Sequence, residues 1–191
     1  MNKKYILKLI LNKRLSFDKN TLNRYSEEIF SNFLKYQKLL NLSNNKLVAG
    51  YYPIKNEVND LLILNYLKNN GFTTLLPSIL KGTKILTFKK YSYDLINGIF
   101  NIKEPAGIDV FLPNVILVPL VAFDNNGNRI GYGGGYYDST INYYKSIGHK
   151  ILYIGVAYSF QEVEYIEASD FDVKLDAIIT EREYKSFDRA S

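Results

Sequence analysis

Two uninterrupted apolar runs constrain the fold of this 191-residue chain more than any other feature. Residues 115–118 read VILV, and residues 151–158 read ILYIGVAY. Runs of this kind are typical of strands that are covered on both faces, whereas a half-exposed strand alternates apolar and polar residues. A helix predicted at 137–145 separates the two runs. The order of strand, helix and strand favours a parallel sheet flanked by helices.

The rest of the chain continues this alternation. Helical spacing of apolar residues predicts helices at 4–13, 18–40 and 58–67, the last closed by Gly71. Short β-prone segments predict strands at 47–52, 73–76, 84–89 and 177–180. No internal repeat, low-complexity linker or shift in composition marks a second domain. We therefore expect a single α/β domain over residues 1–191, a three-layer α/β/α sandwich around a mostly parallel sheet.

Composition restricts the possible chemistry. The absence of cysteine excludes disulfides, thiolate metal sites and cysteine nucleophiles, and the single histidine, His149, excludes a multi-histidine metal centre. Any metal must be held by oxygen, which points to Mg²⁺ or another hard ion. The net charge of +5 favours anionic partners, although the lysines are scattered. Because Lys8 interrupts the N-terminal apolar stretch and no run is long enough to span a bilayer, we expect a cytoplasmic protein without membrane or nucleic-acid partners, a monomer or weak dimer.

Ten residues between the apolar runs, RIGYGGGYYD at 129–138, carry four glycines followed by an acid. These glycines free the backbone to adopt positive φ and to present N–H groups to one side, and the following helix adds the positive end of its dipole. The pattern predicts a phosphate cradle. Two common nucleotide motifs do not fit, because the dinucleotide fingerprint needs glycine at Tyr136 and the P-loop needs Lys and Ser or Thr after its last glycine. A glycine-rich connection without a ligand is the alternative.

Asp138 follows this loop directly. A carboxylate beside a polyphosphate would be repelled unless a divalent cation lay between them, so we expect Mg²⁺ to bridge Asp138 and a nucleotide. Arg129 would meet phosphate oxygens from the other end of the loop. Without a ligand, Asp138 also fits a partner of the helix dipole. The preceding DNNGN, residues 124–128, lacks the glycine and glutamate of a calcium loop and predicts a turn.

The stretch VPLVAFDNNGNRIGYGGGYYD, residues 118–138, resembles the signature of the 5-formyltetrahydrofolate cyclo-ligase family, also called methenyltetrahydrofolate synthetases. Shorter elements of that family occur in the family's order across nearly the whole chain: Lys4, Leu7 and Lys8; Tyr52 and Glu57; Leu76 and Pro77; Glu104 and Pro105; Gln161; Asp172 and Asp176. The resemblance implies an ATP- and Mg²⁺-dependent conversion of 5-formyltetrahydrofolate to 5,10-methenyltetrahydrofolate, with release of ADP and phosphate. No protein nucleophile is implied, because alignment and charge neutralisation carry such a transfer.

The same resemblance implies roles for individual residues. The implied ATP contacts are Lys4, Lys8, Arg129, Ile130, Gly131, Tyr132, Gly133, Gly134, Gly135, Tyr136 and Tyr137. The implied folate contacts are Tyr52, Glu57, Tyr132, Gly133, Gly134, Gly135 and Tyr136, and the implied magnesium ligands are Asp138 and Asp176. From the residues alone, the lysines also fit a solvated helix face, Asp176 a solvated strand edge, and Glu57 the first turn of the 58–67 helix.

Several positions depart from the family pattern. Leu120, Lys8 and Ser139 replace a glycine and two arginines, and Lys8 keeps the charge but loses bidentate contact with phosphate. Tyr132 and Gly134 stand where many members carry Arg and Lys. These departures bear on rate and nucleotide affinity. A non-catalytic nucleotide- or RNA-binding module on the same fold is the alternative function, but no RNP-type motif surrounds GYGGGYY.

Overall fold

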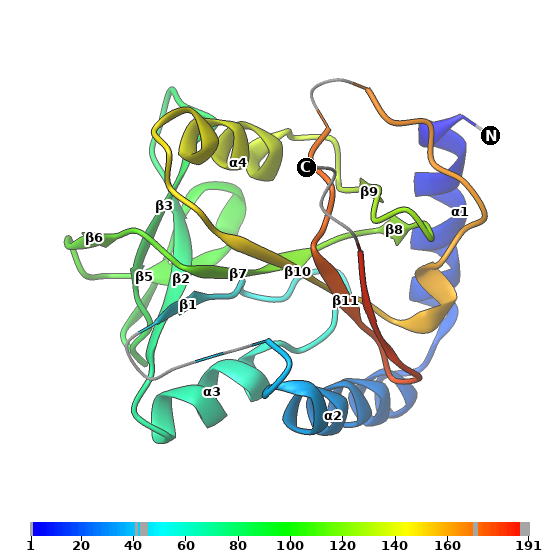
Figure 1. The fold of residues 1–191 in the computed structure, drawn as a ribbon, viewed down its shortest axis with the longest axis horizontal. Coiled ribbons are helices and arrows are strands. Elements are labelled where there is room, and N and C mark those ends of the chain that lie inside the picture. The colour runs from blue at the N-terminus through cyan, green and yellow to red at the C-terminus, as the bar shows by residue number, and fades with distance from the viewer. Residues whose placement is uncertain (1, 41, 43–45, 170–171, 188–191) are drawn as a thin grey trace.

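The computed structural model describes residues 2–40, 42, 46–169 and 172–187. An eight-stranded sheet runs through the centre of the molecule (Figure 1). From one edge to the other, its strands are β12 (Tyr184–Ser186), β11 (Ala177–Ile179), β10 (Leu152–Val156), β7 (Val115–Pro119), β1 (Leu47–Ala49), β2 (Thr73–Ile79), β3 (Leu86–Lys90) and β6 (Val110–Phe111). The five strands from β11 to β2 are parallel, and the outer strands pair antiparallel. The expected mostly parallel sheet is confirmed.

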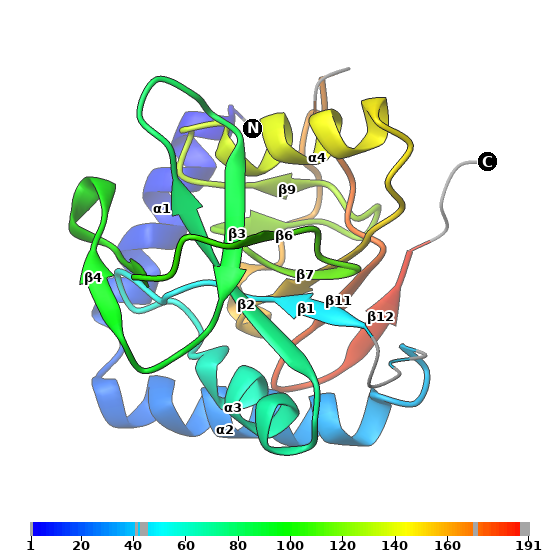
Figure 2. The same cartoon turned by 90° about the vertical axis from the view of Figure 1, so that its left-hand side faces the viewer.

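Helices cover both faces of this sheet (Figures 1 and 2). The helices α2 (Lys19–Tyr36) and α3 (Leu61–Asn69) lie on one face, and α4 (Tyr136–Ser146) lies on the other. Side chains of β7 alternate between the two cores: Val115 and Leu117 pack in the core under α2 and α3, and the next residue of each pair packs under α4. Coverage on both faces explains why the run is apolar throughout. The predicted three-layer architecture is therefore confirmed.

The first helix, α1 (Lys3–Ser16), lies beside the sheet (Figure 1). It packs on a short hairpin formed by β8 (Ala122–Phe123) and β9 (Arg129–Ile130). Its buried residues Ile6 and Ile10 share one apolar cluster with Val121, Ala122, Ile130 and Ile166. This helix therefore depends on a platform that lies more than a hundred residues further along the chain.

Side-chain caps fix where the first two helices begin. The side chain of Asn2 accepts a hydrogen bond from Lys4 N at 2.9 Å, and that of Asp18 accepts one from Thr21 N at 2.9 Å. The helices predicted at 4–13 and 18–40 are confirmed in kind, although α1 is longer than predicted and α2 ends at Tyr36. None of the described helices is both long and apolar enough to cross a membrane.

Two boundaries predicted after residue 50 are wrong. The strand predicted at 47–52 ends at Ala49, and the helix predicted from residue 58 begins at Leu61. The cause is Asp60, a fully buried residue whose carboxyl group accepts a hydrogen bond from Tyr51 N at 2.8 Å and so joins the two ends of the intervening loop. Glu57 lies within that loop, and its interpretation as the start of a helix is wrong.

Very short strands were not predicted. They are β6, β12, the β8–β9 hairpin, and a second hairpin of β4 (Leu95–Asn97) and β5 (Lys103–Pro105). Each has only two or three residues, which is too short for a periodic pattern. The turn predicted at 124–128 is confirmed, because Asp124 Oδ1 accepts hydrogen bonds from Asn126 N at 2.9 Å and Asn128 N at 3.0 Å.

Candidate active site

Three adjacent parallel strands, β10, β7 and β1, have their carboxyl ends at the same edge of the sheet. Ligands of open α/β sheets collect at this carboxyl edge. The loops that follow the three strands contact one another: Gln161 Nε2 donates to the Leu120 carbonyl at 2.8 Å, and the Tyr158 hydroxyl donates to the Glu57 carbonyl at 3.1 Å. The edge is therefore a connected polar region built from segments that are distant in sequence.

The glycine loop, residues 131–135, connects β9 to α4. Gly135 is the N-cap residue of α4 with a φ of 73°, and Gly133 has a φ of 88°. Glycine adopts these left-handed values without steric cost, and the first N–H groups of any helix lack an acceptor within it. The Lys84 ammonium, from the β2–β3 connection, lies 3.9 Å from the position that a Cβ would take on Gly135. The backbone has the form that an anion cradle requires, with a lysine beside it that was not predicted.

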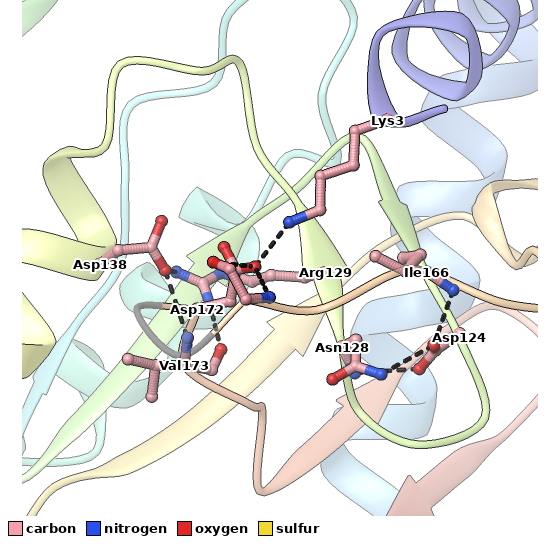
Figure 3. Close-up of polar contacts among 9 residues, drawn as sticks. Lys3, Asp124, Asn128, Arg129, Asp138, Ile166, Asp172 and Val173 are labelled. Carbon is pink, nitrogen blue, oxygen red and sulfur yellow. Dashed lines mark hydrogen bonds and ion pairs between the residues drawn. The ribbon is translucent and has the colours of Figure 1, made fainter. Parts of the chain in front are cut away.

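Arg129 and Asp138 join the two ends of the glycine loop (Figure 3). Arg129 Nη2 lies 2.7 Å from Asp138 Oδ1, and Nη1 donates to the carbonyl of Val173. The Arg129 side chain is 5% exposed, and that of Asp138 is 36% exposed. The guanidinium therefore points toward protein groups. Its predicted contact with phosphate would use the donors that these two partners leave free, and it stays a prediction.

The two predicted magnesium ligands have different surroundings. Asp138 lies in the first turn of α4, and among the described residues only its Oδ1 has protein partners. Asp176 precedes β11, and its Oδ2 accepts a hydrogen bond from Tyr153 N at 2.6 Å. Within the described ranges, no three acidic or histidine side chains form a cluster that could hold a metal. A carboxylate with one oxygen left by its protein partners suits Mg²⁺ that phosphate oxygens and water also hold, and the metal roles of Asp138 and Asp176 both stay predictions.

A buried arginine that was not predicted contacts the middle of the glycine loop. Arg14, in the last turn of α1, has no solvent exposure. Its Nη1 donates to the Tyr132 hydroxyl and its Nη2 to the Leu120 carbonyl, each at 2.9 Å. The sequence did contain a signal, because Arg14 continues the four-residue spacing of Ile6 and Ile10 along the buried stripe of α1.

Glu57 lies in the loop after β1 and is almost fully buried. Burial raises the pKa of its carboxyl group from 4.5 to about 7, against the hydrogen bond from Ile54 N, the charge of Arg14 and the hydroxyl of Tyr132, which lower it. The hydrogen bond from Ile54 N to Oε2 is 2.9 Å long. Near neutral pH this side chain is therefore balanced between acid and carboxylate. Arg14, Glu57 and the half-buried Tyr132 form one polar cluster, named here the Arg14 cluster.

The predicted N-terminal lysines lie on the surface. Lys4 and Lys8 are exposed on α1, while Lys3 forms an ion pair of 2.5 Å with Asp172 (Figure 3). Partial burial raises the pKa of Asp172, but hydrogen bonds from Lys3 and Ser169 outweigh that effect and hold the pKa below its ordinary value. Lys4 and Lys8 are accessible to a ligand at the surface, and their contact with phosphate stays a prediction.

Three predicted tyrosines, Tyr52, Tyr136 and Tyr137, are half-buried. Tyr136 opens α4, and its ring meets the exposed ring of Phe100 edge-on at a centroid distance of 6.1 Å. Burial, followed by the negative charge of Glu57, raises the pKa of Tyr137 well above its ordinary value. The Tyr137 hydroxyl therefore stays protonated beside the Arg14 cluster.

The resemblance found in residues 118–138 extends over nearly the whole chain. The model of the 5-formyltetrahydrofolate cyclo-ligase family matches residues 2–181. The chain belongs to this family. It is 32% identical over 185 residues to the 5-formyltetrahydrofolate cyclo-ligase of Mycoplasma pneumoniae, covering 95% of this chain and 99% of that protein. A cyclo-ligase of the same name from Mycoplasma genitalium is 33% identical over 180 residues, covering 94% of this chain and 98% of the relative.

Solved structures agree with this family assignment. The 5,10-methenyltetrahydrofolate synthetase of Aquifex aeolicus matches with a TM-score of 0.81 and 29% identity, over 100% of this chain and 95% of the other. The synthetase of Mycoplasma pneumoniae matches with a TM-score of 0.70 and 29% identity, over 95% of this chain and 99% of the other. The fold and the enzyme class implied by the resemblance are confirmed, and the chain is an enzyme of the cyclo-ligase family. The roles of individual site residues stay predictions.

Proposed function

We propose that the chain converts 5-formyltetrahydrofolate to 5,10-methenyltetrahydrofolate in a reaction that consumes ATP and requires Mg²⁺. The observation that carries the proposal is the Arg14 cluster, in which Tyr132 of the glycine loop meets the buried Glu57. An anion cradle and a buried carboxyl group at one sheet edge suit an enzyme that brings a nucleotide to a pterin. The family match over residues 2–181 supports the same reaction.

The proposed reaction balances as a phosphoryl transfer followed by ring closure. A formamide carbon is a poor electrophile, and its oxygen is a poor leaving group. The γ-phosphoryl group of ATP moves to the formyl oxygen, breaking its bond to ADP. The neighbouring side-arm nitrogen then attacks the formyl carbon and loses its proton, and phosphate departs with the former formyl oxygen. Alignment and neutralisation of charge carry such a transfer, so no protein nucleophile is needed.

The proposed nucleotide-binding groups are residues 129–137 with Lys4 and Lys8. The loop offers backbone N–H donors beside the positive end of α4, and the lysines add charge from α1. Mg²⁺ bound with the nucleotide would neutralise phosphate charge. Asp138 would give it a carboxylate oxygen, and Asp176 is the second proposed ligand.

Glu57 is the proposed recognition group for the pterin. A carboxylate accepts hydrogen bonds from the amino and N–H groups of that ring, and a protonated carboxyl group loses part of this capacity. Because the pKa of Glu57 is about 7, folate affinity is expected to rise as the pH rises through that value. Tyr52 and Tyr136 offer ring faces for the substrate, with loop residues 132–135 beside them.

The direct test is turnover by the purified protein. The product of 5-formyltetrahydrofolate is followed by its near-ultraviolet absorbance, with ATP and Mg²⁺ present together and with each omitted in turn. Product is expected only in the complete mixture. No product in that mixture would refute the proposed function. A rate that stays at the value of the complete mixture when Mg²⁺ is omitted and a chelator is added would refute the metal requirement.

A further inference from the structure

Arg14 is a costly residue to place where it lies. A guanidinium taken fully out of water needs compensation from hydrogen bonds and from a nearby negative charge. Its two direct acceptors, the Tyr132 hydroxyl and the Leu120 carbonyl, carry no charge, and its Nε has no hydrogen-bond partner among the described residues. An aliphatic side chain could fill the end of the α1 stripe without that cost, so anchoring of α1 does not explain the arginine.

The compensating charge is Glu57, reached through Tyr132. Because Arg14 donates to the oxygen of Tyr132, the hydroxyl proton of Tyr132 remains available for an acceptor. The Glu57 side chain lies beside that hydroxyl: as a hydrogen-bond donor Tyr132 lowers the pKa of Glu57, and Glu57 raises the pKa of Tyr132. Chains of hydrogen bonds polarise one another in a buried setting, so a donor at one end strengthens the bond at the other.

The ring of Tyr132 is held by a second cation as well. Lys55 Nζ lies 5.1 Å from the ring centroid, and Arg14 Cζ lies 6.0 Å from it. Lys55 and Asn56 both have positive φ, at 48° and 61°. Non-glycine residues adopt this conformation at a cost, and it is maintained where surrounding contacts require it. The loop that carries Glu57 therefore reaches Tyr132 through Lys55.

We infer that Arg14 is a positioning residue for folate binding: acting through the Tyr132 hydroxyl, it orients Glu57 and keeps it in the ionised form that accepts hydrogen bonds from the pterin. The inference rests on the proposed function. It makes the affinity of the folate site depend on a side chain of α1, which lies outside the loops that form the carboxyl edge. The interaction also links the glycine loop, through the Tyr132 hydroxyl, to the Glu57 carboxylate that is proposed to bind folate.

Other groups face Glu57 and set the background for any pH dependence. They are Arg14 from α1, Tyr132 from the glycine loop, Tyr137 from α4, Tyr158 after β10, and Tyr51, Lys55 and Asp60 from the loop of Glu57 itself. Of these, Arg14 and Lys55 lower the pKa of Glu57 by their charge. Loss of Arg14 is therefore expected to move the pKa of Glu57 upward from about 7.

The experiment is a mutant cycle measured over a pH range. The wild type, Arg14→Met, Glu57→Gln and the double variant are assayed from pH 6 to 9 at saturating ATP, and kcat is separated from the KM for 5-formyltetrahydrofolate. If Arg14→Met raises the pKa of Glu57 by about one unit, its KM at pH 7 should rise roughly fivefold to tenfold and return to within about twofold of wild type at pH 9. In the Glu57→Gln background, Arg14→Met should change KM by less than about twofold.

Controls separate this role from a structural one. Lys13→Gln removes one exposed charge next to Arg14 and should leave KM unchanged at every pH. If Arg14→Met does not fold, Tyr132→Phe serves instead, since it removes the linking hydroxyl and should show the same pH-dependent rise in KM. A rise in KM that is equal at all pH values, or equal in the wild-type and Glu57→Gln backgrounds, would overturn the inference. Turnover by the wild type would still uphold the proposed function in that case. An inactive wild type would refute the proposed function itself.

Discussion

Two buried arginines hold the glycine loop, and their charges are balanced in different ways. Arg129 forms a direct ion pair with Asp138, nine residues away. Arg14 donates to the uncharged hydroxyl of Tyr132, 118 residues away, and meets the charge of Glu57 beyond it. The ends of the loop are thus fixed by a local pair, whereas its middle is fixed by a distant helix. The difference shows how one short loop can be set by both local and long-range interactions.

Removal of Asp138 breaks the local ion pair with Arg129 and has the largest expected effect. Asp138→Ala should lower kcat roughly 100-fold or more, because it removes the proposed magnesium ligand and the partner of Arg129. Asp138→Asn keeps an oxygen for Arg129 but loses the charge, so its Tm should fall less than that of Asp138→Ala while its kcat remains low. Steady-state kinetics and thermal unfolding measure the two effects. Full turnover by Asp138→Ala would exclude the metal role.

Glu57→Gln tests the long-range interaction of Arg14, Tyr132 and Glu57 through the pH dependence of the unfolding free energy. The pKa of Glu57 in the folded protein, about 7, lies above its ordinary value of 4.5, so ionisation disfavours the folded state. The wild type should therefore lose stability relative to Glu57→Gln as the pH rises from about 4.5 through 7. Between pH 5 and 8, the difference in unfolding free energy should shift in favour of the variant by on the order of 3 kcal/mol. Denaturant titrations at both pH values measure it, and a difference independent of pH would contradict the raised pKa.

The backbone between the two arginines can be tested with two glycines. Gly135→Ala places a side chain at a φ of 73° and should cost about 1–2 kcal/mol of stability. Gly131→Ala is the matched control, because its φ is not positive and a Cβ there would meet no described atom within 4 Å. Denaturant unfolding compares the two. Equal losses for both variants would show that the left-handed N-cap is not what the loop requires.

The exposed charges of α1 give the smallest expected effect and complete the contrast with Arg14 on the same helix. Lys4→Gln and Lys8→Gln should each raise the KM for ATP about twofold to fivefold, because a solvated charge contributes little. The effect should shrink as salt is added. Lys19→Gln, an exposed lysine at the start of α2, is the control. An effect of Lys4→Gln that does not change with salt would contradict a simple phosphate contact.

The sequence predicted those features that leave a local pattern. The run at 115–118 was recognised because burial on both faces removes every polar residue from it, and the glycine loop was recognised because positive φ selects glycine. The start of α3 was predicted wrongly, because a tertiary hydrogen bond from Tyr51 to Asp60 overrides the helical spacing that begins at Val58. Local patterns carry no information about a contact of that kind.

The candidate site divides along the same line. Arg129, Asp138 and the loop glycines lie within ten residues of one another, so their association could be predicted. Arg14 was missed because its partners, Leu120 and Tyr132, lie 106 and 118 residues away, and an arginine near the end of a helix ordinarily fits a solvated position. Its place on the stripe of Ile6 and Ile10 was the available clue, and it indicated burial without naming a partner.

The docking of α1 on the β8–β9 hairpin has a consequence for biosynthesis. Ile6 and Ile10 are translated more than a hundred residues before the side chains that cover them, which are Val121, Ala122, Ile130 and Ile166. Because these contacts join residues so far apart in sequence, α1 cannot pack until most of the chain has been made. Until then the apolar face of α1 stays exposed on the nascent protein. Chaperone demand during translation should therefore concentrate on the amino-terminal helix.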